Sequence, residues 1–371
     1  MSSGQAEEAA AALAVATDSF DPELLPVEHA TAANMLGAAL RACGRGGEAV
    51  SVLIDAAEEF SANGRPLEAG AALFNLGLVR REAGDRSGAV SCLKRARALL
   101  DPARVPVSAS AAARELGSAL FEGGDLGPAV TELKEAVDLA ARAGDRAAMG
   151  AAANALGLAH LAAGCFDAGV GSLAIAVDAN PRSVRPEGYA MAKANLALAY
   201  EQMGEASRSR QAARQALSVP GAPRPIQVQA RELLTRLGPG PLDLFAVLDD
   251  EPRERWPAVL REEMTRWVAL GAAARLVETK EWVAGQTARV AQGGDLAEAW
   301  VGVLLELPPQ DMELVVGATL GALAERSTAE RQRFRAQVSS AMVRFHAPQW
   351  LRLKDTFNRV SAELGQDDGW G

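Results

Sequence analysis

The chain has few of the residues on which most metal, redox and catalytic chemistry depends. Among its 371 residues are three cysteines and three histidines, and aromatic residues make up only 5%. Cys43, Cys92 and Cys165 form no Cys-x-x-Cys pair, so we expect no zinc site and a reducing, cytoplasmic environment. The first basic residue is Arg41, which leaves no charged region for a signal peptide, and the longest apolar run, residues 314–324, is too short to span a bilayer.

Motifs of enzymatic chemistry are missing as well. His29, His160 and His346 lie far apart and have no zinc-protease spacing, and the sequence contains neither a Gly-rich phosphate loop with lysine nor a Gly-x-Ser-x-Gly elbow. Acidic clusters such as Asp249–Glu251 are typical of solvated helix ends. We therefore predict that the protein is not an enzyme and binds no cofactor or metal. Its net charge of −9 argues against general nucleic-acid binding.

A pattern with a 40-residue period dominates the chain as far as position 218. Each copy begins with a leucine, and the five are Leu36, Leu76, Leu116, Leu156 and Leu196. Eight residues later each copy has a glycine, and these are Gly44, Gly84, Gly124, Gly164 and Gly204. The residue after the leucine is Gly37, Gly77, Gly117, Gly157 and Ala197 in turn. A fixed period of this length is the mark of a repeat array, which usually forms a binding surface.

Apolar and small residues on either side of the central glycine recur at helical offsets. They predict two amphipathic helices joined by a tight turn, with the glycine at a helix C-terminus. The glycine at position 37 and its equivalents lie inside the first helix, where glycine costs about 1 kcal/mol relative to alanine. That cost is explained if a neighbouring helix packs closely against it, with Leu53 and its equivalents filling the layer between helices. His160 occupies a packing position of this pattern, so a core role is favoured.

The pattern is similar to the tetratricopeptide repeat (TPR) consensus over about residues 28–218. The usual unit has 34 residues, and this one has 40, which resembles the long-helix variant of scaffold proteins of the Pins type and of helical sensor domains in bacterial regulators. The resemblance implies an all-α solenoid of helix-turn-helix repeats. The composition, rich in arginine and alanine, is typical of a GC-rich bacterial genome.

Four segments are expected. Residues 1–27 would hold a partial repeat or cap helix over residues 5–17, and residues 28–237 five repeats and a capping helix. Residues 238–241, Gly-Pro-Gly-Pro, would be a linker. Residues 242–371 contain all six tryptophans and would form a helical C-terminal domain, with helices around 255–277, 279–292, 295–306 and 309–325 and two more after Ser327.

In the family that the repeats resemble, ligands contact first-helix positions two before, two after and five after the motif leucine. Carried over, the resemblance implies a peptide-binding groove lined by Asn34, Ala38, Arg41, Phe74, Leu78, Arg81, Arg114, Ser118, Phe121, Asn154, Leu158, Leu161, Ala194, Leu198 and Glu201. We assign nine of them to the site: Asn34, Arg41, Phe74, Arg81, Arg114, Phe121, Asn154, Leu158 and Leu198. Such a lining suits a peptide with acidic groups at one end and apolar anchors at the other.

The leading functional hypothesis is an intracellular adaptor or scaffold that binds a peptide segment of a partner protein. One alternative is a bacterial regulator or sensor, in which a groove ligand controls the C-terminal domain. Another is a non-catalytic accessory subunit of an enzyme complex or biosynthetic pathway. Arg326, Arg333 and Arg344 could contact phosphate, but such a stripe is more often the solvated side of a helix. The sequence leaves homo-oligomerisation open.

Overall fold

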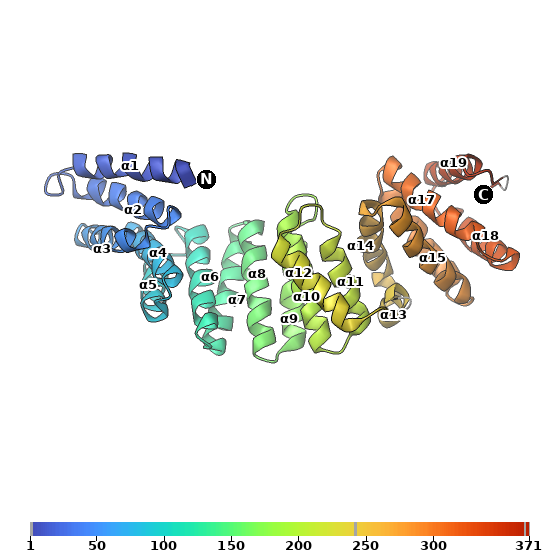
Figure 1. The fold of residues 1–371 in the computed structure, drawn as a ribbon, viewed down its shortest axis with the longest axis horizontal. Helices are drawn as coiled ribbons and strands as arrows, with labels where there is room; N and C mark the ends of the chain where they lie inside the picture. The colour runs from blue at the N-terminus through green and yellow to red at the C-terminus, as the bar shows by residue number, and fades with distance from the viewer. Residues whose placement is uncertain (1–2, 241–242, 367–368, 371) are drawn as a thin grey trace. The chain divides into compact units, whose positions relative to one another are not determined.

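The computed structural model describes residues 3–240, 243–366 and 369–370 and divides into two compact units, residues 1–195 and 196–371. Over the described residues the fold is all helical, without strands, as predicted (Figure 1). The division falls within helix α10, upstream of the predicted linker. Gly238 within that linker has a φ of +66°, and residue 241 lies outside the described part. The four-segment organisation stays a prediction.

The first unit contains nine whole helices and the start of a tenth. They are α1 (Ser3–Ser19), α2 (Pro26–Ala42), α3 (Gly46–Ala62), α4 (Pro66–Glu82), α5 (Arg86–Leu99), α6 (Pro106–Glu122), α7 (Leu126–Arg142), α8 (Arg146–Ala162), α9 (Phe166–Ala179) and α10 (Pro186–Gln202). The first helices of the repeats, from α2 to α10, start at a regular 40-residue spacing, and so do the second helices. The cap helix predicted over residues 5–17 is α1.

The turn inside each repeat depends on its central glycine. The five glycines have φ between +74° and +87°, a region that L side chains rarely adopt. In the first repeat the amide of Gly44 donates to the carbonyl of Arg41 and that of Arg45 to the carbonyl of Leu40, so carbonyls at the end of α2 are satisfied. The predicted role of this glycine is confirmed.

The glycine after each motif leucine is the point of closest approach between the paired helices. A Cβ placed on Gly77 would lie 2.7 Å from Cγ of Leu93, and on Gly117 it would lie 2.6 Å from Cγ of Leu133. The fifth pair has alanine on both sides, Ala197 and Ala213, both fully buried. A larger residue on one helix is thus matched by a smaller one on the other.

The connectors between repeats alternate between two kinds. Residues 20–25, 100–105 and 180–185 are the longer kind, and residues 63–65 and 143–145 are the shorter. In two of the long connectors an aspartate accepts from the amide two residues on: Asp21 from Glu23 and Asp101 from Ala103, both at 2.9 Å. The short connectors turn at Gly64 and Gly144, which have positive φ. The backbone therefore has an 80-residue period in addition to the 40-residue one.

Within the first unit, the first helices form one layer of the stack. Helix α2 contacts α4, α4 contacts α6, and α6 contacts α8, while α3, α5 and α7 each pack between two first helices. Because successive first helices approach each other directly, their shared face is the inner side of this stack.

The second unit contains the end of α10 and nine further helices. They are α11 (Ala206–Leu217), α12 (Arg224–Leu237), α13 (Asp243–Asp250), α14 (Trp256–Ala269), α15 (Ala272–Ala288), α16 (Gly293–Glu306), α17 (Pro309–Ala324), α18 (Thr328–Met342) and α19 (Ala347–Glu363), with a 3-10 turn at Arg253–Arg255. The predicted capping helix is α12. From α14 to α17 each helix packs against the one two places further on, up to the pair α17 and α19.

The boundary expected between the helices over residues 255–277 and 279–292 is misplaced, because α14 ends at Ala269 and α15 runs without interruption from Ala272 to Ala288. The backbone is extended at Leu270 and Gly271, which ends α14 and begins α15. The guanidinium of Arg275 donates to the carbonyls of Trp267 (2.9 Å) and Leu270 (2.6 Å) and so satisfies the end of α14. The apolar periodicity runs through this break, which is why the sequence pattern did not reveal it.

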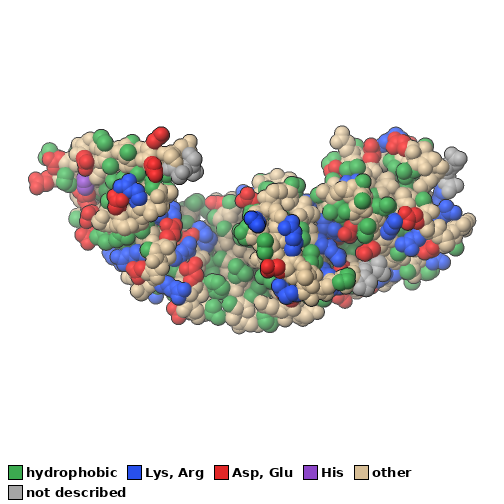
Figure 2. Space-filling view, in the orientation of Figure 1, with side chains coloured by type: hydrophobic (Ala, Val, Ile, Leu, Met, Phe, Trp, Pro, Cys, Tyr) green, Lys and Arg blue, Asp and Glu red, His purple; other side chains and the backbone are tan. Residues whose placement is uncertain are grey.

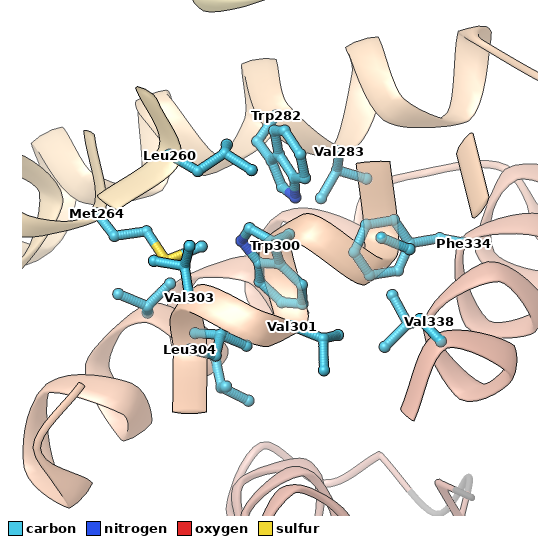
Figure 3. Packing of buried hydrophobic residues seen from close by; sticks show 14 of the residues in the cluster. Leu260, Met264, Trp282, Val283, Trp300, Val301, Val303, Leu304, Phe334 and Val338 are labelled. Atoms are coloured by element: carbon cyan, nitrogen blue, oxygen red, sulfur yellow. The ribbon is translucent and has the colours of Figure 1, made fainter. Parts of the chain in front are cut away.

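Tryptophan and phenylalanine side chains form the core of the part that contains helices α14 to α19. Trp282 stacks on Trp300 at 6.1 Å between ring centroids, and the edge of Phe334 meets Trp300 at the same distance (Figure 3). Trp267 and Phe357 are also fully buried. The tryptophan-rich segment thus builds a core of its own, as predicted.

A buried ionic network joins α11 to the helices that follow it. Asp243, which is 2% exposed, accepts from Arg210 and pairs with Arg214 at 2.9 Å. Glu263 accepts from Gln215 at 2.7 Å and from Arg266. Helix α11, the second helix of the fifth repeat, is therefore tied to α13 and α14 by desolvated charges, whose loss is costly once one partner is removed.

We expect the close crossing to be testable by a double-mutant cycle. Gly117→Ala should destabilise the protein by about 1–2 kcal/mol because the new methyl overlaps Leu133. Leu133→Ala alone should cost about 2–5 kcal/mol. The double variant should be more stable than the sum of the two losses predicts, because it recreates the alanine pair of the fifth repeat.

Urea unfolding followed by circular dichroism gives these free energies. The control is Gly171→Ala on α9, where the added Cβ meets no atom within 4 Å. It should stabilise the helix by up to about 1 kcal/mol. Strict additivity of the two α6–α7 substitutions would refute the steric explanation.

A second prediction concerns Glu281 on α15. Burial, with the nearby carboxylate of Glu278, raises the pKa of Glu281. Because the pKa is higher in the folded state, the ionised carboxylate opposes folding at neutral pH, and that opposition fades as the pH falls through the folded pKa. Glu281→Gln should raise Tm at pH 7 and give a smaller difference at pH 4. Glu254→Gln, at an exposed position, is the control, and an unchanged or lower Tm for Glu281→Gln at pH 7 would contradict the assignment.

Candidate interaction face of the first helices

The predicted groove residues lie on α2, α4, α6, α8 and α10. Thirteen of the fifteen positions are half-buried. Leu161 and Ala194 are buried, and Leu161 packs against Gly169 of the neighbouring second helix. In Figure 2 charged side chains gather over α4 and α5, whereas the surface over α7, α8 and α9 is mainly hydrophobic and uncharged.

Polar side-chain pairs bridge successive first helices. Asn75 donates to Asn34 at 2.9 Å, and Asn195 donates to Asn154 at 2.9 Å. Arg41 donates to Glu82 at 2.6 Å. In the second unit Arg236 of α12 pairs with Glu201 of α10 at 2.8 Å. Asn34, Asn154 and Arg41 are therefore held in place by partners on the next first helix. The partners Asn75 and Asn195 lie one residue before the motif leucine, and Glu82 lies six residues after it.

Two of the predicted arginines share one carboxylate. Glu115 on α6, only 5% exposed, pairs with Arg81 of α4 and with Arg114, both at 2.5 Å. One negative charge therefore faces two positive ones, so this part of the face keeps a net positive charge. The guanidiniums are also fixed in position before any ligand arrives, which lowers the entropy lost on binding an acidic group.

The α6–α8 boundary is apolar. No polar side-chain pair joins these two helices among the described residues. Phe121 packs against the hydrophobic clusters around Leu93 and Leu133, and Leu158 stays half-exposed on α8. Phe74 takes part in more packing, since it contacts three hydrophobic clusters and lies between the second repeat and the third. Of the two predicted aromatic residues, Phe121 therefore lies at the apolar boundary between α6 and α8, on which Leu158 also lies. Phe74 contributes mainly to packing between repeats.

In the second unit a pocket of about 620 Å³ lies between α10 and α12. The predicted residue Leu198 lines it, together with Val228 and Pro225, and Arg224 and Glu232 lie at its polar edge. Val228 is 41% exposed, so the pocket presents apolar surface. Leu198 itself is half-buried in this lining.

The other sequence candidates have structural surroundings. His160 on α8 is half-buried, and burial lowers its pKa, so it is neutral at pH 7. Arg326 and Arg333 donate to the carbonyls of Lys280 and Thr287, both at 2.9 Å, and Arg344 pairs with Glu298. The three arginines therefore link α18 and the residues at its two ends to α15 and α16. No cluster of three or more metal-ligating side chains occurs among the described residues, and no helix there is long and apolar enough to cross a bilayer.

Sequence comparisons found no matching family model and no matching curated protein. Among solved structures, BtubC (BKLC) from P. vanneervenii is 13% identical with a TM-score of 0.50, over 64% of this chain and 94% of that one. Nearly identical TPR-like repeats of a kinesin light chain from Podosopora anserina are 21% identical with a TM-score of 0.44, over 54% and 96%. MamA is 21% identical with a TM-score of 0.38, over 56% and 92%.

These likenesses concern the fold. Helix pairs that repeat in register, each packed on the next, define an α-solenoid. The leucine-glycine motif, the positive-φ glycine at the turn and the small residues of the second helix identify it as a solenoid of the tetratricopeptide type, in agreement with the sequence resemblance. Its 40-residue unit is the long variant.

We expect Glu115 to be the most stabilising polar residue of the face. Glu115→Ala would leave the guanidiniums of Arg81 and Arg114 without the carboxylate with which both form ion pairs. Since both arginines are partly solvated, the loss should be about 1–3 kcal/mol, below that of a fully buried pair. Urea unfolding measures it, with the exposed Glu122→Ala on the same helix as the control, expected within about 0.5 kcal/mol of wild type. Equal effects of the two substitutions would show that the shared pair contributes nothing.

Proposed function

We propose that this protein is an adaptor or scaffold that binds a peptide segment of a partner protein along the first-helix face of its repeats. The observation that carries the proposal is the positive cluster of Arg81, Arg114 and Glu115 next to the apolar surface of Phe121 and Leu158. The three free cysteines support placing this activity in the cytoplasm.

The ligand is defined by the two neighbouring surfaces. An aspartate, a glutamate or a terminal carboxylate would accept from Arg81 and Arg114, which Glu115 neutralises only in part. One helix pair further along, an apolar side chain would pack on Phe121 and Leu158, burying surface that is otherwise exposed. A segment with an acidic group followed by an apolar anchor satisfies both, and polar pairs such as Asn34–Asn75 and Asn154–Asn195 lie at either side.

Selection of a displayed random-peptide library on the full-length protein tests this function. Selected peptides should combine acidic and apolar positions. Arg81→Glu, Arg114→Glu and Leu158→Asp should each weaken binding by about tenfold or more, which corresponds to about 1.4 kcal/mol or more. Fluorescence anisotropy of the labelled peptides gives the Kd values.

The matched control is Arg95→Glu, which makes the same charge change at an exposed position of the second helix α5. It should leave Kd within about twofold of wild type, because salt largely screens an exposed charge that lies outside the first-helix face. Peptides that bind Arg81→Glu and Leu158→Asp as tightly as the wild type would place the ligand elsewhere and refute the proposal.

A further inference from the structure

A second groove lies on helices α15, α17 and α19 of the second unit. It is far in sequence from the first-helix face and independent of the function proposed above. It has a volume of about 730 Å³ and runs along α17 between α15 and α19. Its apolar lining includes Leu276, Leu314, Gly317, Ala318, Gly321 and Val360.

The floor of this groove is made of small residues that the fold itself does not require. A Cβ on Gly317 would meet only Val360, at 3.5 Å, and one on Gly321 only Leu276, at 3.6 Å, which are ordinary van der Waals contacts. At Gly117, by contrast, the same Cβ would clash with a leucine. Glycine in a helix interior weakens the helix. Two such residues one turn apart therefore keep open a recess that internal packing does not use.

The dimensions of the recess match a helix. Its lining on α17 runs from Gln310 to Gly321, a length of about 17 Å at 1.5 Å per residue, or three helical turns. Leu314 at one side and Leu364 at the end are 42% and 47% exposed. Small residues on the floor let a second helix approach the backbone of α17 closely, while these leucines would cover its sides.

The charges at the rim are unbalanced. Arg359 pairs with Glu313 at 2.5 Å and with Glu363 at 3.3 Å, so two carboxylates share one guanidinium. Arg275 is the cation among the lining residues, and it is 8% exposed with its guanidinium donating to carbonyls at the end of α14. The rim therefore complements a positive charge.

We propose that this groove binds an amphipathic helix of another protein, with small or medium apolar side chains on the face that meets Gly317 and Gly321 and a lysine or arginine beside Glu313 and Glu363. The adaptor would then hold two different segments, one on each unit.

Two fluorescein-labelled helical peptides, each long enough to span the three turns of the recess, test this. Both carry alanine and leucine at positions i, i+3, i+4 and i+7, and they differ in having lysine or glutamate on the flanks. Anisotropy with the full-length protein should show binding of the lysine peptide at micromolar concentrations and at least about tenfold weaker binding of the glutamate peptide. Gly317→Phe and Glu363→Lys should each weaken the lysine peptide by about tenfold or more.

The control is Gly127→Phe on α7, where an added Cβ meets no atom within 4 Å, and it should leave Kd unchanged. Gly317→Ala should raise Tm, which shows that the position tolerates a side chain. Absence of binding by the lysine peptide at 1 mM, equal binding of both peptides, or binding that Gly317→Phe leaves intact would each overturn the proposal. So would a dimer that Gly317→Phe dissociates, since a second copy would then be the occupant. None of these outcomes depends on Arg81 or Leu158.

Discussion

The structure of the repeats depends on one steric constraint, the contact between a glycine of the first helix and a leucine of the second. Four repeats place glycine opposite leucine, as in Gly37 with Leu53 and Gly117 with Leu133, and the fifth places alanine opposite alanine. Where the first helix gains a methyl group, the second helix has lost its leucine, as expected where two backbones must cross at a fixed distance. That distance sets the position of every side chain on the face above it.

On that face, stability and recognition use the same residues. The side chains that would bind a ligand are already paired across helix boundaries, as Arg41 is with Glu82 and Asn154 with Asn195. Such pairs hold neighbouring repeats in register and orient the donors. The pairing is unequal at Glu115, which lies between two arginines, and among the described residues no polar side-chain pair joins α6 to α8. In the proposed function the charge-balanced parts of the face align the helices, and these two places would receive the ligand.

Much of the fold could be predicted because its determinants are local and recur. The 40-residue period located the five helix pairs, and the central glycines located the turns within them. What escaped prediction depends on contacts between residues far apart in sequence. The partners Asn75, Glu115 and Asn195 occupy a position that the family pattern does not mark as functional, and no local signal distinguishes them. The break at Leu270 is stabilised by Arg275 binding carbonyls of the preceding helix, an interaction that hydrophobic periodicity cannot show. The nine predicted site residues came from the family resemblance, and all of them are half-buried on the first helices. The deeper packing of Phe74 depends on the angle between repeats, which the sequence does not show.

The alternation of connectors has a consequence for how this array can change in length. Since long and short connectors follow each other, two neighbouring repeats are not interchangeable. The smallest segment that can be removed or duplicated without bringing two connectors of the same kind together is therefore a four-helix, 80-residue block. Shortened or extended versions of the protein should be designed, and natural ones sought, in steps of two repeats.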